Sequence, residues 1–198
     1  MAEEQALVLS VTASALHDFS KPSAPSLTLI QGYGIEGDSH AGETVQHRSR
    51  LHLNPSPPNL RQVHLIPIEI LQTVSGRFSA NERRAILDPG ALGQNITTEG
   101  IDLLALGSGT ELHFVDPTDP LPVETAPAIK ITGLRNPCPQ IDDFLPGLRE
   151  EFLIRDANRR IVGRLAGVMA TVTRGGVVTP WMKILVSKPA EHVPLGPV

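Results

Sequence analysis

Hydrophobic and polar residues alternate along much of this sequence with the two-residue period of a half-buried β-strand. The first example is the stretch 7–12, in which every second residue is leucine or valine. The strand candidates found in this way are residues 7–12, 27–29, 62–66, 110–115, 128–132, 165–173 and 177–186. The Arg174-Gly-Gly176 segment between the last two predicts a hairpin turn. Strand candidates outnumber helical ones, which predicts a mainly β fold.

Helical periodicity is confined to short pieces of the chain. A proline at a first helical position predicts a helix over residues 67–75, and a second helix is predicted over 81–87. After Pro139, apolar residues recur at helical spacing as far as Phe152, with a kink or interruption expected at Pro146. The sequence has 17 Gly and 18 Pro among 198 residues, so frequent turns and few long helices are expected.

Two irregular stretches lie between the strand candidates. Residues 30–37 hold three glycines within six positions, which predicts a tight, exposed corner. Residues 38–61 keep no period, and their prolines forbid a regular element, so this stretch is either a functional loop or locally disordered. No linker divides the chain. We therefore expect one domain over residues 1–198, with a core at about 6–187, built as a β-barrel with a few short helices.

Charge and cysteine content narrow the classes of function. Lys and Arg number 17 and Asp and Glu 21, for a formal charge of -4, which offers no basic face for a nucleic acid. The first five residues are acidic where a targeting signal would be basic, and the apolar stretch 6–15 is too short to cross a bilayer. One cysteine cannot form an intramolecular disulfide. These features predict a cytoplasmic protein without nucleic-acid or membrane partners.

The single cysteine, Cys138, lies between two prolines where a strand candidate gives way to a helical pattern. The prolines fix the backbone, and the unpaired N–H groups of a helix start favour a thiolate, as does the nearby Arg135. A thiolate suits a thiophilic metal or a persulfide. The plainer alternative is a small buried hydrophobic side chain.

Histidines gather in the second candidate region. Four of the seven histidines fall between positions 40 and 64, with Asp38 and Glu69 close in sequence. A metal site of His and carboxylate ligands is one interpretation. The other is an anion-facing loop in which Arg and His donate hydrogen bonds. On its strand candidate, His64 points to the face opposite Val63 and Leu65, and that face is either core or pocket.

The third candidate region is the turn-rich segment 88–100. It carries Asn95, Thr97 and Thr98 beside several glycines. Amide and hydroxyl side chains with exposed backbone N–H groups bind polar heterocycles or phosphates. The same residues also make ordinary turns.

Taken together, these pieces resemble the MOSC family (molybdenum cofactor sulfurase C-terminal domain) from near Ser10 to near Leu185. The matching segments are Gly37-Asp-Ser-His40, Arg61-Gln-Val-His-Leu65, Leu92-Gly-Gln-Asn-Ile-Thr97 and Arg135-Asn-Pro-Cys138. Gln94 departs from the family pattern, in which we expect Glu. The aminotransferase-like sulfurase domain and a reductase domain are also absent from this sequence.

The resemblance implies a β-barrel with a pocket for a molybdenum-pterin cofactor. Cys138 would ligate molybdenum or carry sulfur. Arg135, Asn95 and Thr97 would help to hold the cofactor. The further cofactor-binding candidates in family-like motifs are His64, His40, Asp38 and Arg61.

Three functions remain open from the sequence. The first is an oxidoreductase that reduces N-hydroxylated small molecules, with Cys138 on molybdenum and an electron-donor protein as partner. The second is a sulfur carrier or cofactor-handling protein, in which Cys138 holds a persulfide and a sulfurase is the partner. The third is a metal-free barrel that binds another small molecule or protein.

Overall fold

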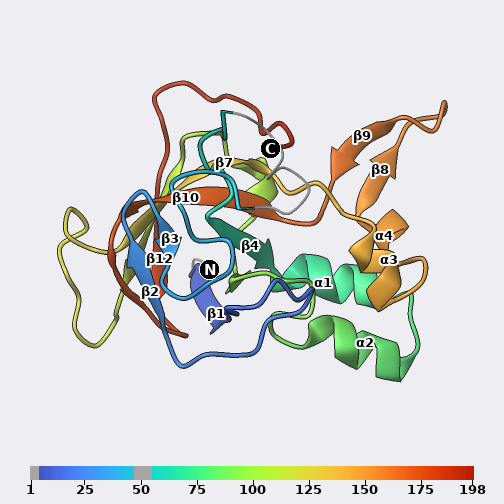
Figure 1. Cartoon of the computed structure of the whole chain (residues 1–198), viewed down its shortest axis with the longest axis horizontal. Helices are drawn as coiled ribbons and strands as arrows, with labels where there is room; N and C mark the ends of the chain where they lie inside the picture. Colours follow the sequence, from blue (N-terminus) through green and yellow to red (C-terminus); the bar gives the residue numbers. More distant parts are fainter. Residues whose placement is uncertain (1–4, 47–54) are drawn as a thin grey trace.

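The computed structural model describes residues 5–46 and 55–198, and its centre is a closed β-barrel (Figure 1). Around the barrel the strands follow the order β1-β12-β6-β7-β10-β4-β5, and β5 closes the ring by pairing with β1. Their bounds are β1 Leu7–Val11, β4 Val63–Pro67, β5 Ile96–Glu99, β6 Glu111–Val115, β7 Ala128–Leu134, β10 Val168–Arg174 and β12 Lys183–Ser187. The mainly β fold and the barrel predicted from the sequence are confirmed.

Alternation along the strands explains the barrel. Apolar residues such as Val8, Ile96 and Leu112 turn inward and form one buried cluster, and closure leaves no strand edge without a partner. Only the β4–β5 pair is parallel among the paired strands described. A parallel pair needs a crossover, and the chain supplies it as two helices, α1 (Ile68–Ser75) and α2 (Ala80–Leu87).

The C-terminal third departs from the hairpin predicted at Arg174-Gly-Gly176. β10 lies between β7 and β4 in the barrel, whereas β11 (Gly176–Val178) leaves it and joins β2 (Leu27–Ile30) and β3 (Gly34–Ile35) in a separate sheet. Gly176 has φ +141° and would clash with Pro127 if it carried a Cβ. The single strand predicted over residues 177–186 is therefore wrong, because a turn at Trp181, with φ 72°, separates β11 from β12.

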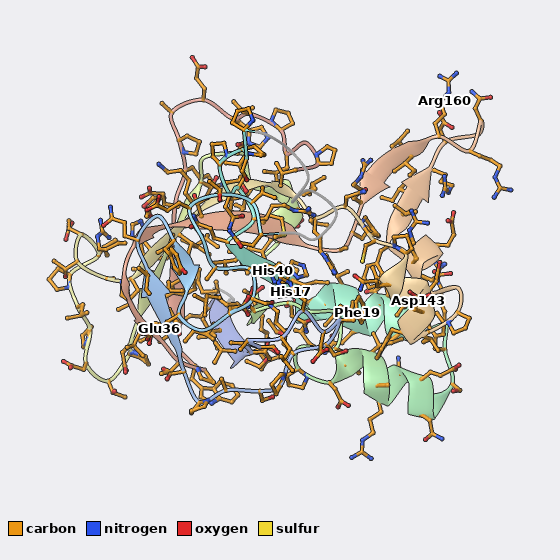
Figure 2. The ribbon with its side chains drawn as sticks, viewed as in Figure 1. His17, Phe19, Glu36, His40, Asp143 and Arg160 are labelled. Carbon is orange, nitrogen blue, oxygen red and sulfur yellow. The ribbon has the colours of Figure 1, made fainter. Side chains whose placement is uncertain are left out.

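The region after Pro139 also differs from a single helix. Two short helices, α3 (Gln140–Phe144) and α4 (Leu148–Glu151), are separated at Pro146 and at Gly147, which has φ +84°. A two-stranded hairpin then follows, β8 (Leu153–Arg155) with β9 (Ile161–Arg164), which the periodicity did not reveal. Figure 2 shows Arg160 at the tip of this hairpin, away from the barrel.

The helices pack on the barrel through a second apolar cluster, in which Ile66, Leu71 and Phe152 are fully buried. A capping box starts α2, since the Ser79 side chain and the Glu82 side chain each bond the other's backbone N–H. Among the helices of residues 5–46 and 55–198, none has the length and apolar character to cross a membrane. The chain therefore has two packed parts, and the junction between them holds the pocket described next.

Candidate functional site

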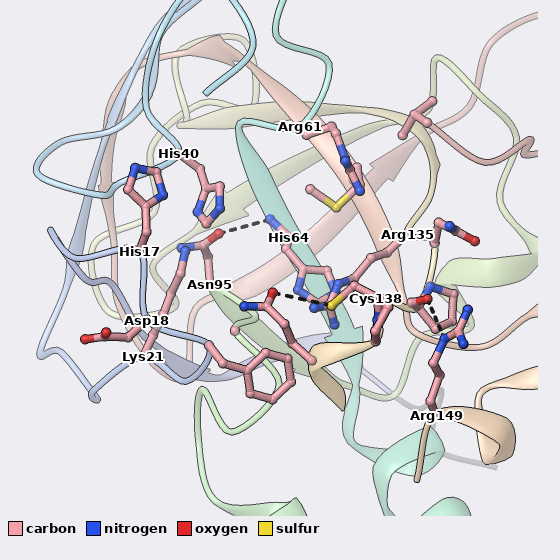
Figure 3. Close-up of a pocket in the computed structure, with 18 residues that line it drawn as sticks. His17, Asp18, Lys21, His40, Arg61, His64, Asn95, Arg135, Cys138 and Arg149 are labelled. Atoms are coloured by element: carbon pink, nitrogen blue, oxygen red, sulfur yellow. Dashed lines mark hydrogen bonds between the residues drawn. The ribbon is translucent and has the colours of Figure 1, made fainter. Parts of the chain in front are cut away.

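A pocket of about 650 Å³ opens where the barrel meets the loops before and after the helices (Figure 3). Figure 3 shows His17, His40 and Asn95 on one side, and Arg135, Cys138 and Arg149 on the other. Segments far apart in sequence contribute to its lining, which comprises His17, Asp18, Phe19, Lys21, His40, Arg61, His64, Gly93, Asn95, Arg135, Asn136, Pro137, Cys138, Pro139, Gln140, Arg149, Met169 and Val198.

The floor of the pocket is set by β4. Val63 and Leu65 point into the barrel core, so strand alternation turns His64 outward to the pocket. The His64 Nε2 lies 2.8 Å from the Ala166 carbonyl oxygen, and its backbone N–H donates to Asn95 Oδ1 at 3.1 Å. Burial holds the pKa of His64 well below its usual range, and the charge of Arg135 lowers it further. His64 is therefore a neutral imidazole with Nε2–H donating to the carbonyl.

One side of the pocket is organised around Asp38, whose side chain is fully buried beneath the lining residues. Its carboxylate accepts hydrogen bonds from Lys21 Nζ at 2.7 Å, Asn95 Nδ2 at 3.0 Å and the His40 backbone N–H at 3.0 Å. Burial alone would raise the pKa of Asp38. The contacts with His40 and with the Lys21 ammonium outweigh that effect and hold the pKa well below its usual range. Asp38 and Lys21 thus form a buried, mutually neutralising pair.

His40 connects this buried pair to the pocket. Its Nδ1 lies 3.3 Å from Asp38 Oδ1, and its side chain is 23 % exposed. The exposed His17 packs edge-on against it, with the two ring centroids 5.7 Å apart. Burial lowers the pKa of His40, and the charges of Lys21 and His17 act in the same direction against that of Asp38. At neutral pH His40 is an uncharged ring.

The opposite side of the pocket is the segment that follows β7. The backbone N–H of Arg135 donates to the Gly167 carbonyl at 3.0 Å, which fixes the start of this segment. Arg135 Nη1 is shielded from solvent and has no hydrogen-bond partner within the described residues. Cys138 is half-buried, and its Sγ lies 3.7 Å from Gln140 Oε1. Arg149 reaches the same segment through Nε, which donates to the Pro137 carbonyl at 3.1 Å.

The pocket is strongly cationic. Lys21, Arg61, Arg135 and Arg149 line it, while Asp18 is the one acidic side chain among its described lining residues. Lys21 is neutralised from below by Asp38, so the guanidinium groups dominate the field. Burial lowers the pKa of Arg135, which the nearby Cys138 opposes, yet a guanidinium stays protonated under all ordinary conditions. The site is therefore suited to an anion such as a phosphate ester.

The structure brings together most of the residues singled out from the sequence. His40, Arg61, His64, Asn95, Arg135 and Cys138 all line the pocket, and Asp38 lies directly beneath it. Thr97, expected beside Asn95, does not line it: this buried residue of β5 accepts a hydrogen bond from Gln94 Nε2 at 3.4 Å. Gln94 is itself buried and accepts from the Leu92 N–H at 3.0 Å, so an amide serves here as a structural group.

A histidine and carboxylate metal site does not assemble in the described part of the chain. Residues 5–46 and 55–198 contain no group of three His, Cys, Asp or Glu side chains arranged to hold an ion. Glu69 instead accepts a hydrogen bond from the Gly100 N–H at 2.7 Å. His47 and His52, two members of the sequence cluster, lie outside the described residues. The two described histidines of the sequence cluster, His40 and His64, lie instead against Asp38 and the Ala166 carbonyl, and the anion-facing loop stays a prediction.

Sequence reasoning missed four polar pocket residues, His17, Asp18, Lys21 and Arg149. His17 and Lys21 precede the Gly37-Asp-Ser-His40 motif in an irregular stretch without period. Lys21 is 4 % exposed in the structure. Its polar sequence context, with Pro22 beside it, gave no sign of this burial. Arg149 lies within a run of helical periodicity, where a charged residue between apolar positions is expected to face solvent.

Comparison with known proteins gives a consistent assignment. The MOSC domain family matches residues 40–180. The solved structure of the YuaD protein from Bacillus subtilis has 21% identity and a TM-score of 0.66, over 93% of this chain and 97% of that one. YiiM from Escherichia coli has 15% identity and a TM-score of 0.58, over 96% and 72%.

YiiM from Geobacillus stearothermophilus has 14% identity and a TM-score of 0.57, over 92% of this chain and 75% of that one. No curated protein matches the sequence. The likeness to the solved structures shows a shared fold, and the family match extends over most of the chain. The chain therefore belongs to the MOSC domain family, a family of proteins associated with the molybdenum cofactor.

Proposed function

We propose that this protein binds a molybdenum-pterin cofactor in the pocket and reduces N-hydroxylated small molecules, with Cys138 as the protein ligand of the metal. The observation that carries the proposal is the segment after β7. It sets a half-buried thiol beside Arg135, whose Nη1 is buried and has no partner in the described chain. A buried donor without a partner is costly, so its retention points to a bound acceptor.

The residues present fit such a cofactor. Arg135, with Arg61 and Arg149 around it, offers charge-assisted hydrogen bonds to the anionic phosphate. Asn95 is held rigidly by Asp38 and by the His64 N–H, and it lines the same pocket. The ring of His64 lines the same pocket beside Arg135 and offers a polar edge to a heterocycle bound there.

Cys138 supplies the soft donor that molybdenum accepts. When bound, the cofactor would supply the two-electron redox chemistry that no side chain can provide. The chain's own contribution is to hold the anion, orient the heterocycle and place the thiol on the substrate side of the pocket. The reducing electrons would come from an electron-carrier protein as partner.

The test is expression in a host that makes the pterin cofactor, followed by metal analysis, pterin fluorescence after denaturation and a reductase assay. We expect about one molybdenum per chain and reduction of phenylhydroxylamine by reduced benzyl viologen. Cys138→Ser should keep the pterin, because the phosphate and ring contacts remain, while the reductase activity collapses. Arg135→Ala is the matched control, since it leaves the sulfur in place and weakens cofactor retention.

Two results would contradict the proposal. The cofactor assignment would be wrong if the purified protein contained neither molybdenum nor pterin although the same host loads another molybdenum enzyme. Protein with both, in which wild type accepts labelled sulfur on Cys138 and reduces nothing, would favour the sulfur-carrier function instead.

A further inference from the structure

Figure 3 shows His17 and His40 on the side of the pocket opposite Cys138, and the buried Asp38 and Lys21 pair lies beneath His40. His17 is exposed, His40 packs against it at 5.7 Å between ring centroids, and Asp38 lies 3.3 Å below His40 Nδ1. In Figure 2 the two histidines are labelled next to each other, near the middle of the view. The contacts proposed above for the phosphate come from the guanidinium groups of Arg61, Arg135 and Arg149.

We propose that His17 and His40 carry protons from solvent into the pocket, and that His40 donates the proton to the oxygen that leaves the substrate. Asp38 is the positioning residue in this arrangement. The inference rests on the function proposed above, and it assigns to that reaction a proton source which the cofactor contacts do not provide.

The stoichiometry of the reaction requires such a source. Reduction of a hydroxylamine to an amine breaks the N–O bond and takes up two electrons and two protons. One proton converts the leaving hydroxyl to water, and the other completes the N–H of the amine. An electron-carrier protein supplies the electrons, so each turnover must also deliver two protons to the substrate.

The geometry selects His40 among the pocket groups. With Nδ1 turned to Asp38, the imidazole directs its Nε2 edge away from the carboxylate, and His40 lines the pocket. His64 is unsuited, because its Nε2 is held by the Ala166 carbonyl and its burial disfavours the charged ring. The guanidinium groups do not release protons near neutral pH.

The electrostatics suit a relay rather than a permanent cation. Burial lowers the pKa of His40, Lys21 and His17 lower it further, and Asp38 alone opposes them. The protonated ring is therefore a transient species that forms by transfer from His17 and is lost to the substrate. Lys21 neutralises Asp38 at 2.7 Å, which keeps that carboxylate from retaining the proton.

The first test uses the protein without cofactor and does not depend on turnover. Nitrogen-15 NMR of the histidine rings, with His40 assigned from the His40→Gln spectrum, reports which nitrogen carries the proton. Neutral His40 should carry it on Nδ1, the tautomer that faces Asp38. In Asp38→Asn, the pKa of His40 should fall, because the carboxylate that favours the charged ring is gone. Protonation on Nε2, or an unchanged pKa in Asp38→Asn, would overturn the inference.

The second test uses the loaded enzyme with reduced benzyl viologen and phenylhydroxylamine. His40→Gln should lower kcat about 10²- to 10⁴-fold, the usual range for a lost acid or base, with KM and molybdenum content within a few-fold of wild type. Added imidazole should restore part of kcat in His40→Gly, which a purely structural role would not allow. His17→Gln should show a smaller loss, and His192→Gln, an exposed residue outside the pocket, should show none.

The pH profile completes the test. Wild-type kcat should fall as pH rises through the lowered pKa of His40, and this limb should be absent from His40→Gln. If wild type is active and fully loaded His40→Gln keeps its kcat and its pH profile, the proton path is wrong while the reductase function stands. If loaded wild type reduces no N-hydroxylated probe, the reductase function fails and the proton path fails with it.

Discussion

The two sides of the pocket differ in how their buried charged groups are hydrogen-bonded. Beneath one side, the Asp38 carboxylate is fully buried and accepts hydrogen bonds from Lys21, Asn95 and the His40 backbone. On the other side, Arg135 Nη1 is just as shielded from solvent, yet it has no partner among the described residues. The Asp38 carboxylate is satisfied by groups of this chain, whereas Arg135 Nη1 is the donor for which we propose a bound acceptor.

This difference separates residues that stabilise the fold from residues that we propose bind the cofactor. A fully satisfied network rigidifies its surroundings, and Asp38 joins its own loop to the β1–β2 loop, through Ser14 and Lys21, and to Asn95 before β5. A buried guanidinium without a hydrogen-bond partner carries a desolvation cost, which a bound acceptor would offset. Substitution of the buried Asp38 and Lys21 pair should therefore act mainly on stability, whereas substitution of Arg135 should act mainly on cofactor retention.

The largest effect is expected for Asp38→Ala. Removing one partner of a buried ion pair leaves Lys21 charged and unpaired, which typically costs about 3–5 kcal/mol of unfolding free energy. Chemical denaturation of the protein without cofactor measures this loss. The double variant Asp38→Ala with Lys21→Met should recover much of it, because no buried charge remains. If the single variant lost less than about 1 kcal/mol, the Asp38 network would not be the structural side of the pocket.

The second largest effect is expected for Arg135→Met, and the quantity that changes is the affinity for the cofactor. Hydrogen bonds to charged groups contribute about 1.5–3 kcal/mol each, so affinity for the extracted pterin cofactor should fall roughly 10- to 100-fold. The stability of the cofactor-free protein should stay the same or rise, because a partnerless buried cation is removed. Pterin fluorescence titration and thermal unfolding measure the two quantities. A large loss of stability without cofactor would show that Arg135 belongs to the scaffold.

Sequence reasoning captured the second side better than the first. Arg135 and Cys138 follow the end of β7. Local order left a small buried side chain as the plainer alternative for Cys138, and the family resemblance implied its place at a pocket. His64 was turned away from Val63 and Leu65 by alternation, although the pattern alone left core and pocket equally open. Local periodicity predicts the direction in which a side chain points.

Periodicity does not predict partners across irregular loops. Lys21 and Asp38 are 17 positions apart in stretches without any period, and their pairing depends on how the loops fold over the barrel. The β8–β9 hairpin was missed for a related reason. Its strands are three and four residues long, too short to show alternation beside a run of helical spacing.

The third effect concerns pH and His64. Burial and Arg135 hold the pKa of folded His64 well below 6.5, so the unfolded chain takes up a proton first as the pH falls. Its contribution to stability is complete above pH 6.5 and is lost as pH drops toward the folded pKa, by at most about 1.4 kcal/mol per pH unit. Denaturant unfolding of wild type and His64→Gln between pH 5 and about 7.5 gives the difference. His40 contributes in the same direction, and equal slopes in the two proteins would contradict the role of His64.

The smallest effect is expected for Thr97→Val. This variant tests whether a buried residue of β5 that does not line the pocket affects stability alone. Thr97 is buried in β5, and its hydroxyl accepts a long, 3.4 Å hydrogen bond from Gln94 Nε2. Its removal should cost about 1 kcal/mol of unfolding free energy or less, within the usual range for one neutral hydrogen bond. Since Thr97 does not line the pocket, cofactor affinity should not change, whereas Asn95→Ala should weaken it. Equal losses of affinity in Thr97→Val and Asn95→Ala, measured by the same fluorescence titration, would place Thr97 in the binding site after all.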